Sequence, residues 1–209
     1  MKKLFIVLGV VVIFLGSIAL FKNLIIKSVV TTAASDITGA PVHMDSFQLN
    51  IFNSTIRISG FKMYNPSGFP EGILVSCPKI KVIYDRASLF KQERHLLLVE
   101  IELEEIGLTR NKEGKLNVDS LKIVEESESS PPTPMQIDLL TLNIGKIVYK
   151  DYTGGIEPSV RVYDVNRQKS YKGIPTAQQL ALLVLAEPMK DAAIKNAQIY
   201  GAAMLAERE

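Results

Sequence analysis

The stretch VEIELEEIGL, residues 99–108, contains the pattern that decides the fold. Apolar residues alternate with glutamates from Val99 to Leu103, which predicts a β-strand with one buried and one solvated face. The alternation then slips by one residue, because the next apolar residues are Ile106 and Leu108. A slip would turn the later side chains to the wrong face of the sheet, so it predicts a β-bulge or a short break at that point.

The same slip recurs along the chain. It falls between Met44 and Phe47, between Ile58 and Phe61, between Leu139 and Leu142, and between Ile144 and Ile147. Bulges bend a strand and increase its twist, and frequent Gly-containing turns are typical of antiparallel meanders. We therefore predict a mainly β protein whose antiparallel sheet is strongly curled into a groove with an apolar concave face. On the outer face, glutamates 100, 102 and 104 could pair with lysines 79 and 81 across strands.

An uncharged apolar run, Leu4–Phe21, precedes the strands. As a helix it would be about 27 Å long, close to the ~30 Å hydrocarbon core of a bilayer, which predicts a single transmembrane anchor. A signal peptide cleaved near Ser17–Ala19 and a buried core helix are the alternatives. Two lysines lie on each side of the run, so charge does not set the orientation of the anchor.

The chain divides into five predicted segments. These are the anchor at 1–33, a strand-rich part at 34–124, a Pro/Ser/Glu linker at 125–134, a second strand-rich part at 135–170 and a helical segment at 171–209. The linker sequence EESESSPPTP contains no apolar residue, as expected for a solvated loop. Thr176 and Gln179 form a capping box that predicts a helix start, and Pro188 is expected to end or kink that helix.

Composition argues against several functions. The net charge is +2 and tryptophan is absent, so neither a basic field nor stacking platforms favour nucleic acid. The single cysteine, Cys77, lies in an apolar context that indicates a small buried residue. His43 and His95 have no metal-ligand partners at useful spacing, and no catalytic motif occurs. We expect no catalytic residue, no metal and no cofactor, and thus a protein that is not an enzyme.

Several stretches, in this order, resemble the amino-terminal part of AsmA-family proteins, which are bacterial envelope proteins anchored by one N-terminal helix. The matching stretches are Ile37–Val42, Phe61–Phe69, Ile80–Val82, Val99–Leu103, Asn111–Asn117 and Gly145–Tyr152. The resemblance implies a single-pass protein of the bacterial inner membrane with its body in the periplasm. It also implies a β groove of the bridge-like lipid-transfer type and a role in outer-envelope lipid homeostasis, and it carries over no catalytic residue.

The chain is shorter than the larger members of that family. About ten strands spaced by ~4.8 Å would give a sheet of roughly 50 Å, which is too short for one copy to bridge two membranes. A short groove could still shield an acyl chain, join other copies end to end, or act as a scaffold.

The leading hypothesis is a membrane-anchored protein that handles lipid or assists envelope assembly through its apolar concave face. The predicted groove lining is Leu49, Ile58, Phe61, Val82, Ile101, Leu103, Leu142 and Tyr149. The expected partners are membrane acyl chains, the inner membrane through Leu4–Phe21, and further envelope proteins or a second copy. The alternative is a membrane-anchored scaffold whose core is closed by the C-terminal helices and which carries no lipid.

Overall fold

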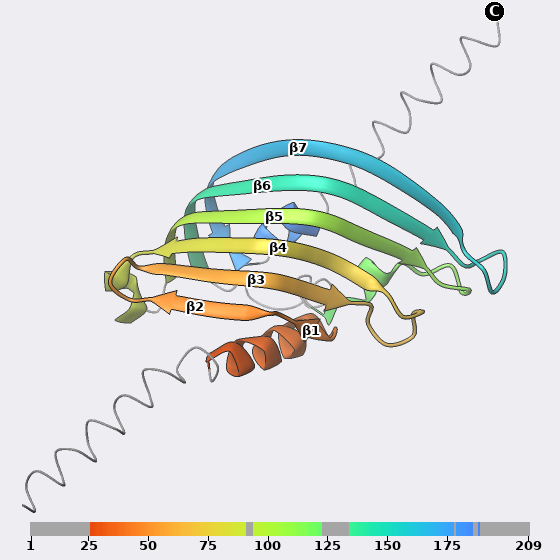
Figure 1. Ribbon diagram of the computed structural model, residues 1–209, viewed down its shortest axis with the longest axis horizontal. Helices are drawn as coiled ribbons and strands as arrows, with labels where there is room; N and C mark the ends of the chain where they lie inside the picture. The colour runs from red at the N-terminus through yellow and green to blue at the C-terminus, as the bar shows by residue number, and fades with distance from the viewer. Residues whose placement is uncertain (1–25, 91–93, 123–133, 178, 186–187, 189–209) are drawn as a thin grey trace, which may run out of the picture.

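The computed structural model describes residues 26–90, 94–122, 134–177, 179–185 and 188 (Figure 1). Its strands are β1 (Val42–His43), β2 (Ser46–Asn50), β3 (Thr55–Tyr64), β4 (Ile73–Tyr84), β5 (Arg94–Arg110), β6 (Pro134–Asp151) and β7 (Ser159–Thr176). Short 3-10 helices cover Arg86–Phe90 (η1) and Asn117–Ser120 (η2), and α-helices cover residues 26–38 and 179–185. The protein is mainly β, as predicted, and the segment called a linker ends one residue earlier than expected because β6 begins at Pro134.

All seven strands belong to one sheet with the order β1-β3-β4-β5-β6-β7, and β2 also pairs with β3. The sheet is mixed, because β5 and β6 run parallel while every other pair is antiparallel. The prediction of a purely antiparallel sheet was therefore wrong. A parallel pair needs a crossover of a dozen or more residues, and the chain between Arg110 and Pro134 is long enough to provide it.

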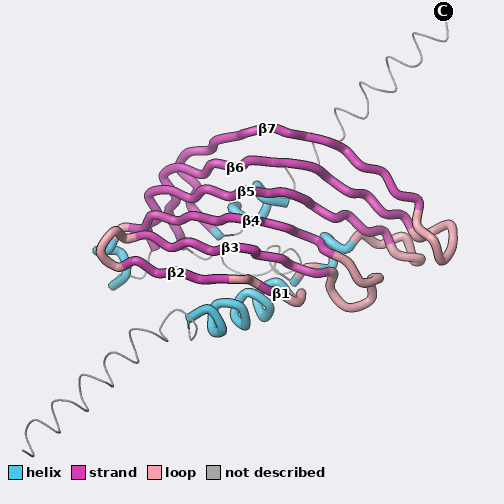
Figure 2. The backbone as a smooth tube through the Cα atoms, viewed as in Figure 1, coloured by secondary structure: helices cyan, strands magenta, loops and turns pink. Residues whose placement is uncertain are grey.

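The sheet is arched, as Figures 1 and 2 show, but it is neither closed nor strongly curled. This corrects the prediction of a strongly curled sheet. The bulge in each strand was expected to increase the curl of the sheet. In the structure several of the irregularities instead fall in one row across neighbouring strands, so that together they act as a bend.

The row of irregularities crosses five strands. Gly60 (φ 61°) lies opposite Pro78, because Ser59 pairs with Lys79 and Phe61 with Cys77. Glu104 lies beside Gly145, between the pairs Leu103–Ile144 and Glu105–Lys146. Opposite Gly145, β7 contains an extra residue and a positive φ at Asn166 (45°). The register shift between Ile144 and Lys146 confirms the predicted slip after Ile144, and the ladder is interrupted at Gly60 and at Glu104, next to the predicted slips after Ile58 and Leu103. The predicted slip between Leu139 and Leu142 was wrong, because β5 and β6 pair without interruption over these residues.

A substitution at Gly145 tests how much the close approach of β5 and β6 in this row contributes to stability. A Cβ at this position would lie 2.5 Å from the backbone carbonyl oxygen of Glu104, which cannot move without disturbing the β5–β6 ladder. We expect Gly145→Ala to lower the free energy of unfolding by about 1–3 kcal/mol. Gly154 has no atom within 4 Å of its virtual Cβ, so Gly154→Ala should be nearly neutral. Urea unfolding of both variants measures the difference, and equal midpoints would contradict the close approach.

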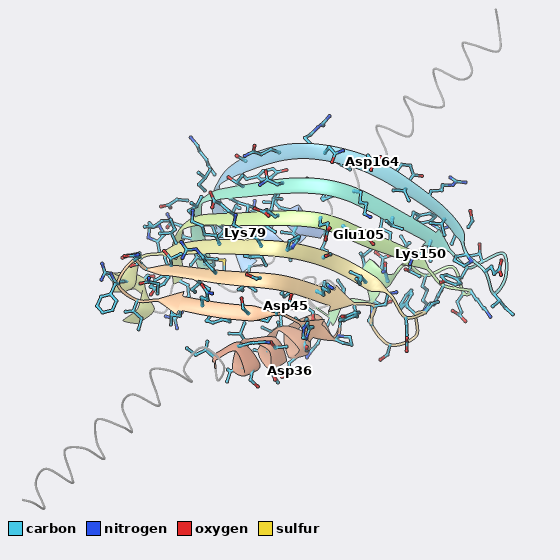
Figure 3. The ribbon with its side chains drawn as sticks, in the orientation of Figure 1. Asp36, Asp45, Lys79, Glu105, Lys150 and Asp164 are labelled. Atoms are coloured by element: carbon cyan, nitrogen blue, oxygen red, sulfur yellow. The ribbon has the colours of Figure 1, made fainter. Side chains whose placement is uncertain are left out.

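The outer face of the sheet is polar and carries the cross-strand pairs that the sequence predicts. Lys79 pairs in register with Glu102 and Lys81 with Glu100, with N–O distances of 3.0 and 2.8 Å. Lys146 forms a further ion pair with Glu105 at 2.9 Å. Figure 3 shows this convex face, with Lys79, Glu105 and Asp164 turned to the viewer.

The helix of residues 26–38 lies along the β1–β2 edge of the sheet (Figure 2). The Lys27 Nζ donates to the carbonyl oxygen of Asp45, and the Val42 N–H donates to the Ser35 hydroxyl, both at 3.0 Å. Among the described residues, no helix combines the length and apolar character that a membrane crossing needs. The predicted anchor, Leu4–Phe21, lies outside the described residues.

Candidate functional site: the apolar sheet face

The eight residues predicted to line a groove share one face of the sheet. Ile101 pairs in register with Ile80 of β4 and Leu142 of β6, and Ile80 pairs with Ile58. Residues paired in register point to the same side of a sheet. The pairs that contain the other predicted residues are Leu49–Ile56, Ile56–Val82, Phe61–Cys77, Leu103–Ile144 and Leu108–Tyr149. The face is apolar from β2 to β6, as the alternating pattern predicts.

Burial changes across this face. On β5 and β6 most of the apolar residues are closed off from solvent: Ile101 is 7% exposed and Leu142 is 0% exposed, and Leu103 is buried as well. Leu96 and Tyr149 are only partly buried. On β2, β3 and β4 the face is mixed: Phe47, Met63 and Cys77 are buried. The residues of these strands that are only partly buried are Leu49, Ile56, Ile58, Phe61, Ile80 and Val82. The face is therefore mostly filled on β5 and β6, and most of its partly open apolar positions lie on β2, β3 and β4, which we call the partly open half.

The C-terminal helix packs on the core cluster of the apolar face. Its start is capped as predicted, because the Gln179 N–H donates to the Thr176 hydroxyl at 3.1 Å. Four apolar residues of the helix pack against the core cluster; they are Leu180, Leu183, Val184 and Leu185. In Figure 1 this helix, coloured blue, lies behind the sheet, on its inner side. Val118 and Leu121, in and beside η2, are buried in the same cluster.

Tyr149 lies at the far end of the apolar face. It is partly buried against the core, and its hydroxyl donates to an Asp151 carboxylate oxygen at 3.3 Å. Burial raises the pKa of this phenol above its usual value, so the side chain is neutral at physiological pH. The Arg110 guanidinium lies 6.0 Å from the centre of the ring. These contacts hold the ring in place.

The polar face has a hollow at the row of irregularities. The hollow has a volume of about 430 Å³, and Pro78, Glu104, Gly145 and Arg167 are among its lining residues. It forms where Gly145 has no side chain and β7 bulges at Asn166. Its walls carry both acidic and basic groups, so its charge selects neither an anion nor a cation.

Two asparagines form a buried polar link that the sequence analysis did not find. Asn117 is fully buried, and its amide donates to the Asn65 side-chain oxygen and to the Gly107 carbonyl, both at 2.7 Å. Its side-chain oxygen accepts from the Thr109 N–H at 3.0 Å. Asn65 follows β3 and Asn117 begins η2, and the fold brings these two distant segments together at one end of the sheet.

His95 has carboxylate partners that the sequence analysis did not name. Its Nε2 lies 2.9 Å from Asp138 and its Nδ1 lies 3.9 Å from Asp85. The hydrogen bond from His95, followed by one from Gln136, holds the pKa of Asp138 below its usual value. Asp138 is distant in sequence and reaches His95 only through the β5–β6 pairing, which spacing along the chain could not reveal.

Cys77 is buried in the core, as predicted. Burial raises the pKa of its thiol to about 12, so the reactive thiolate is suppressed in the folded protein. Within the described residues, no group of three His, Cys, Asp or Glu side chains is arranged to hold a metal ion. The apolar face is the most extended feature that could bind a ligand.

In comparisons with known proteins, the chain matches no family model, no curated protein and no solved structure.

Proposed function

We propose that this chain is a membrane-anchored, non-enzymatic envelope protein that shields lipid acyl chains on the partly open half of its apolar face. The anchor is the Leu4–Phe21 run, and the inner membrane and periplasm are the locations that the AsmA-like stretches imply. The observation that carries the proposal is the burial gradient, by which we mean that apolar side chains of this face are more exposed on β2, β3 and β4 than on β5 and β6. Ile58, Phe61 and Val82 continue the apolar rows of the core, yet they remain partly exposed.

The energetics are adequate for weak lipid binding. A partly exposed apolar strip gains about 0.8 kcal/mol for each lipid methylene that it removes from water. Ten methylenes would contribute about 8 kcal/mol before entropic costs, which leaves room for micromolar affinity. With neighbouring strands ~4.8 Å apart, the path from β1 to β7 spans about 24 Å, so one copy would shield one or two chains and not cross a periplasm.

The scaffold alternative has one observation in its favour. Most of the apolar residues of the β5–β6 half are buried, and the C-terminal helix packs on the same core cluster. A protein whose whole apolar face is closed would hold no lipid and would bind only other proteins. The two functions therefore differ in whether the apolar side chains of β2, β3 and β4 contact lipid.

A charge placed on the open half tests the proposal. We expect Ile58→Asp to leave the domain folded, because water reaches this side chain, and to weaken capture of a fluorescent fatty acid roughly tenfold or more by removing apolar contact. Ser59→Asp is the matched control, since it adds the same charge one residue away on the exposed polar face. Equal capture by the two variants would favour the scaffold function.

A further inference from the structure

The turn between β2 and β3 exposes two large apolar side chains. Phe52 is 88% exposed and Ile51 is 53% exposed. They are adjacent at the tip of the hairpin, where no described element covers them. Tip residues of a soluble turn are usually polar, and a neighbouring pair of exposed apolar side chains on a protruding loop is typical of a contact surface.

The tip lies at the end of the sheet from which the chain runs toward the predicted anchor. Lys27 contacts Asp45, and Ser35 contacts Val42, so the helix of residues 26–38 runs antiparallel to β1 and β2. Its first described residues therefore point in the direction in which β2 runs to the turn. Figure 1 shows the start of this helix and the β2–β3 turn at the same end of the molecule.

The reach of the connecting chain keeps this end near the bilayer. Four residues separate Phe21 from residue 26. At ~3.5 Å per residue, even a fully extended connection would be shorter than about 20 Å. A turn at this end of the body is therefore held close to the surface of any membrane in which Leu4–Phe21 is inserted.

The charges around the tip suit an anionic surface. The β4–β5 connection lies beside the turn, because the Tyr84 N–H donates to the Ser54 carbonyl oxygen at 3.0 Å. The exposed side chain of Arg86 lies in this connection and that of Arg94 at the start of β5, and the acidic residue beside them, Asp85, is partly buried. Basic residues next to exposed aromatic and aliphatic side chains are the usual composition of a segment that lies in the headgroup region of a membrane.

We propose that Phe52 and Ile51 insert into the headgroup–acyl boundary of the membrane that holds the anchor, with Arg86 and Arg94 near the lipid phosphates. This contact would hold the body at a fixed tilt, with the β2–β4 half of the apolar face close to the lipid. The inference rests on the proposed anchor but not on lipid capture by the sheet.

The absence of tryptophan makes a direct test possible, because one substitution creates a protein with a single tryptophan. Phe52→Trp and Ile156→Trp would each be made in the full chain and reconstituted into phosphatidylcholine–phosphatidylglycerol vesicles with or without brominated acyl chains. Ile156 is the matched control, since it is 83% exposed in the β6–β7 turn at the opposite end of the sheet. Flotation of the vesicles reports the anchor independently of fluorescence.

We expect brominated lipid to lower the Phe52→Trp emission roughly twofold or more and to leave the Ile156→Trp emission unchanged. A chain that floats with the vesicles while its Phe52→Trp emission is unquenched would overturn the tip contact and leave the anchor intact. A chain that does not float would overturn both. Equal quenching of the two variants would mean that the body lies against the membrane in another orientation, which also overturns the proposal.

Discussion

Asn117→Leu is expected to lower the free energy of unfolding by about 3–5 kcal/mol. The substitution removes an amide that is fully buried and that satisfies Asn65, Gly107 and Thr109 at once. Each buried polar group left without a partner costs about 1–3 kcal/mol, and a leucine offers none of them a hydrogen bond. Because typical domains are stable by only 5–15 kcal/mol, much of the total would be lost.

Labelling of Cys77 provides the readout for this prediction. The thiol is buried and its pKa is raised to about 12, so it should react with a maleimide only when the core around β4 opens. Labelling across a urea series then gives the unfolding midpoint of the membrane-inserted chain. Asn143→Ala is the control, since Asn143 is exposed on the polar face and should shift the midpoint by less than about 0.5 kcal/mol. Similar midpoints for the two variants would show that the Asn65–Asn117 link contributes little.

Ile101→Asp is expected to unfold the domain. Ile101 is 7% exposed between Ile80 and Leu142, so the new carboxylate would be buried without a partner. Such a charge costs several kcal/mol even when part of the penalty is relieved by protonation. We expect a loss of about 4 kcal/mol or more, and Cys77 that labels without urea.

Ile101→Val and Ile58→Asp are the two controls for Ile101→Asp. Ile101→Val keeps the position apolar and should cost about 0.5–1.5 kcal/mol. Ile58→Asp places the same carboxylate in the same row of the sheet, two strands away on the partly open half, and should stay folded. If Ile101→Asp stayed folded as well, the β5–β6 half would be open to water and the burial gradient would be wrong.

Patterns within single strands predicted much of this fold. The alternation of glutamates on β5 and lysines on β4 predicted a polar outer face on which these residues could pair, because side-chain period alone decides which face each residue takes. The structure pairs Lys79 with Glu102 and Lys81 with Glu100 on that face. The slip after Leu103 predicted an irregularity, and the structure has one at Glu104 and Gly145. The capping box at Thr176 predicted the start of the C-terminal helix for the same local reason.

Features that depend on how distant segments pair could not be predicted. Nothing in β5 or β6 alone shows that they run parallel, since both read as alternating apolar strands. The links between Asn65 and Asn117 and between His95 and Asp138 exist only once that topology is in place. The curl of the sheet was also overestimated, because the sequence shows where bulges occur but not that they align into one row. Which half of the apolar face stays open depends on where the C-terminal helix packs, and amphipathic pattern does not specify that.

The most direct test of the central claim is to map where an acyl chain touches the protein. The full chain would be reconstituted with a phospholipid carrying a diazirine in its acyl chain, irradiated, digested and analysed by peptide mass spectrometry. The account predicts adducts on peptides from β3 and β4 that contain Ile58, Phe61 or Val82, in addition to those on the Leu4–Phe21 run. Adducts confined to Leu4–Phe21, with none on the sheet, would contradict the proposal that the open half of the apolar face shields lipid.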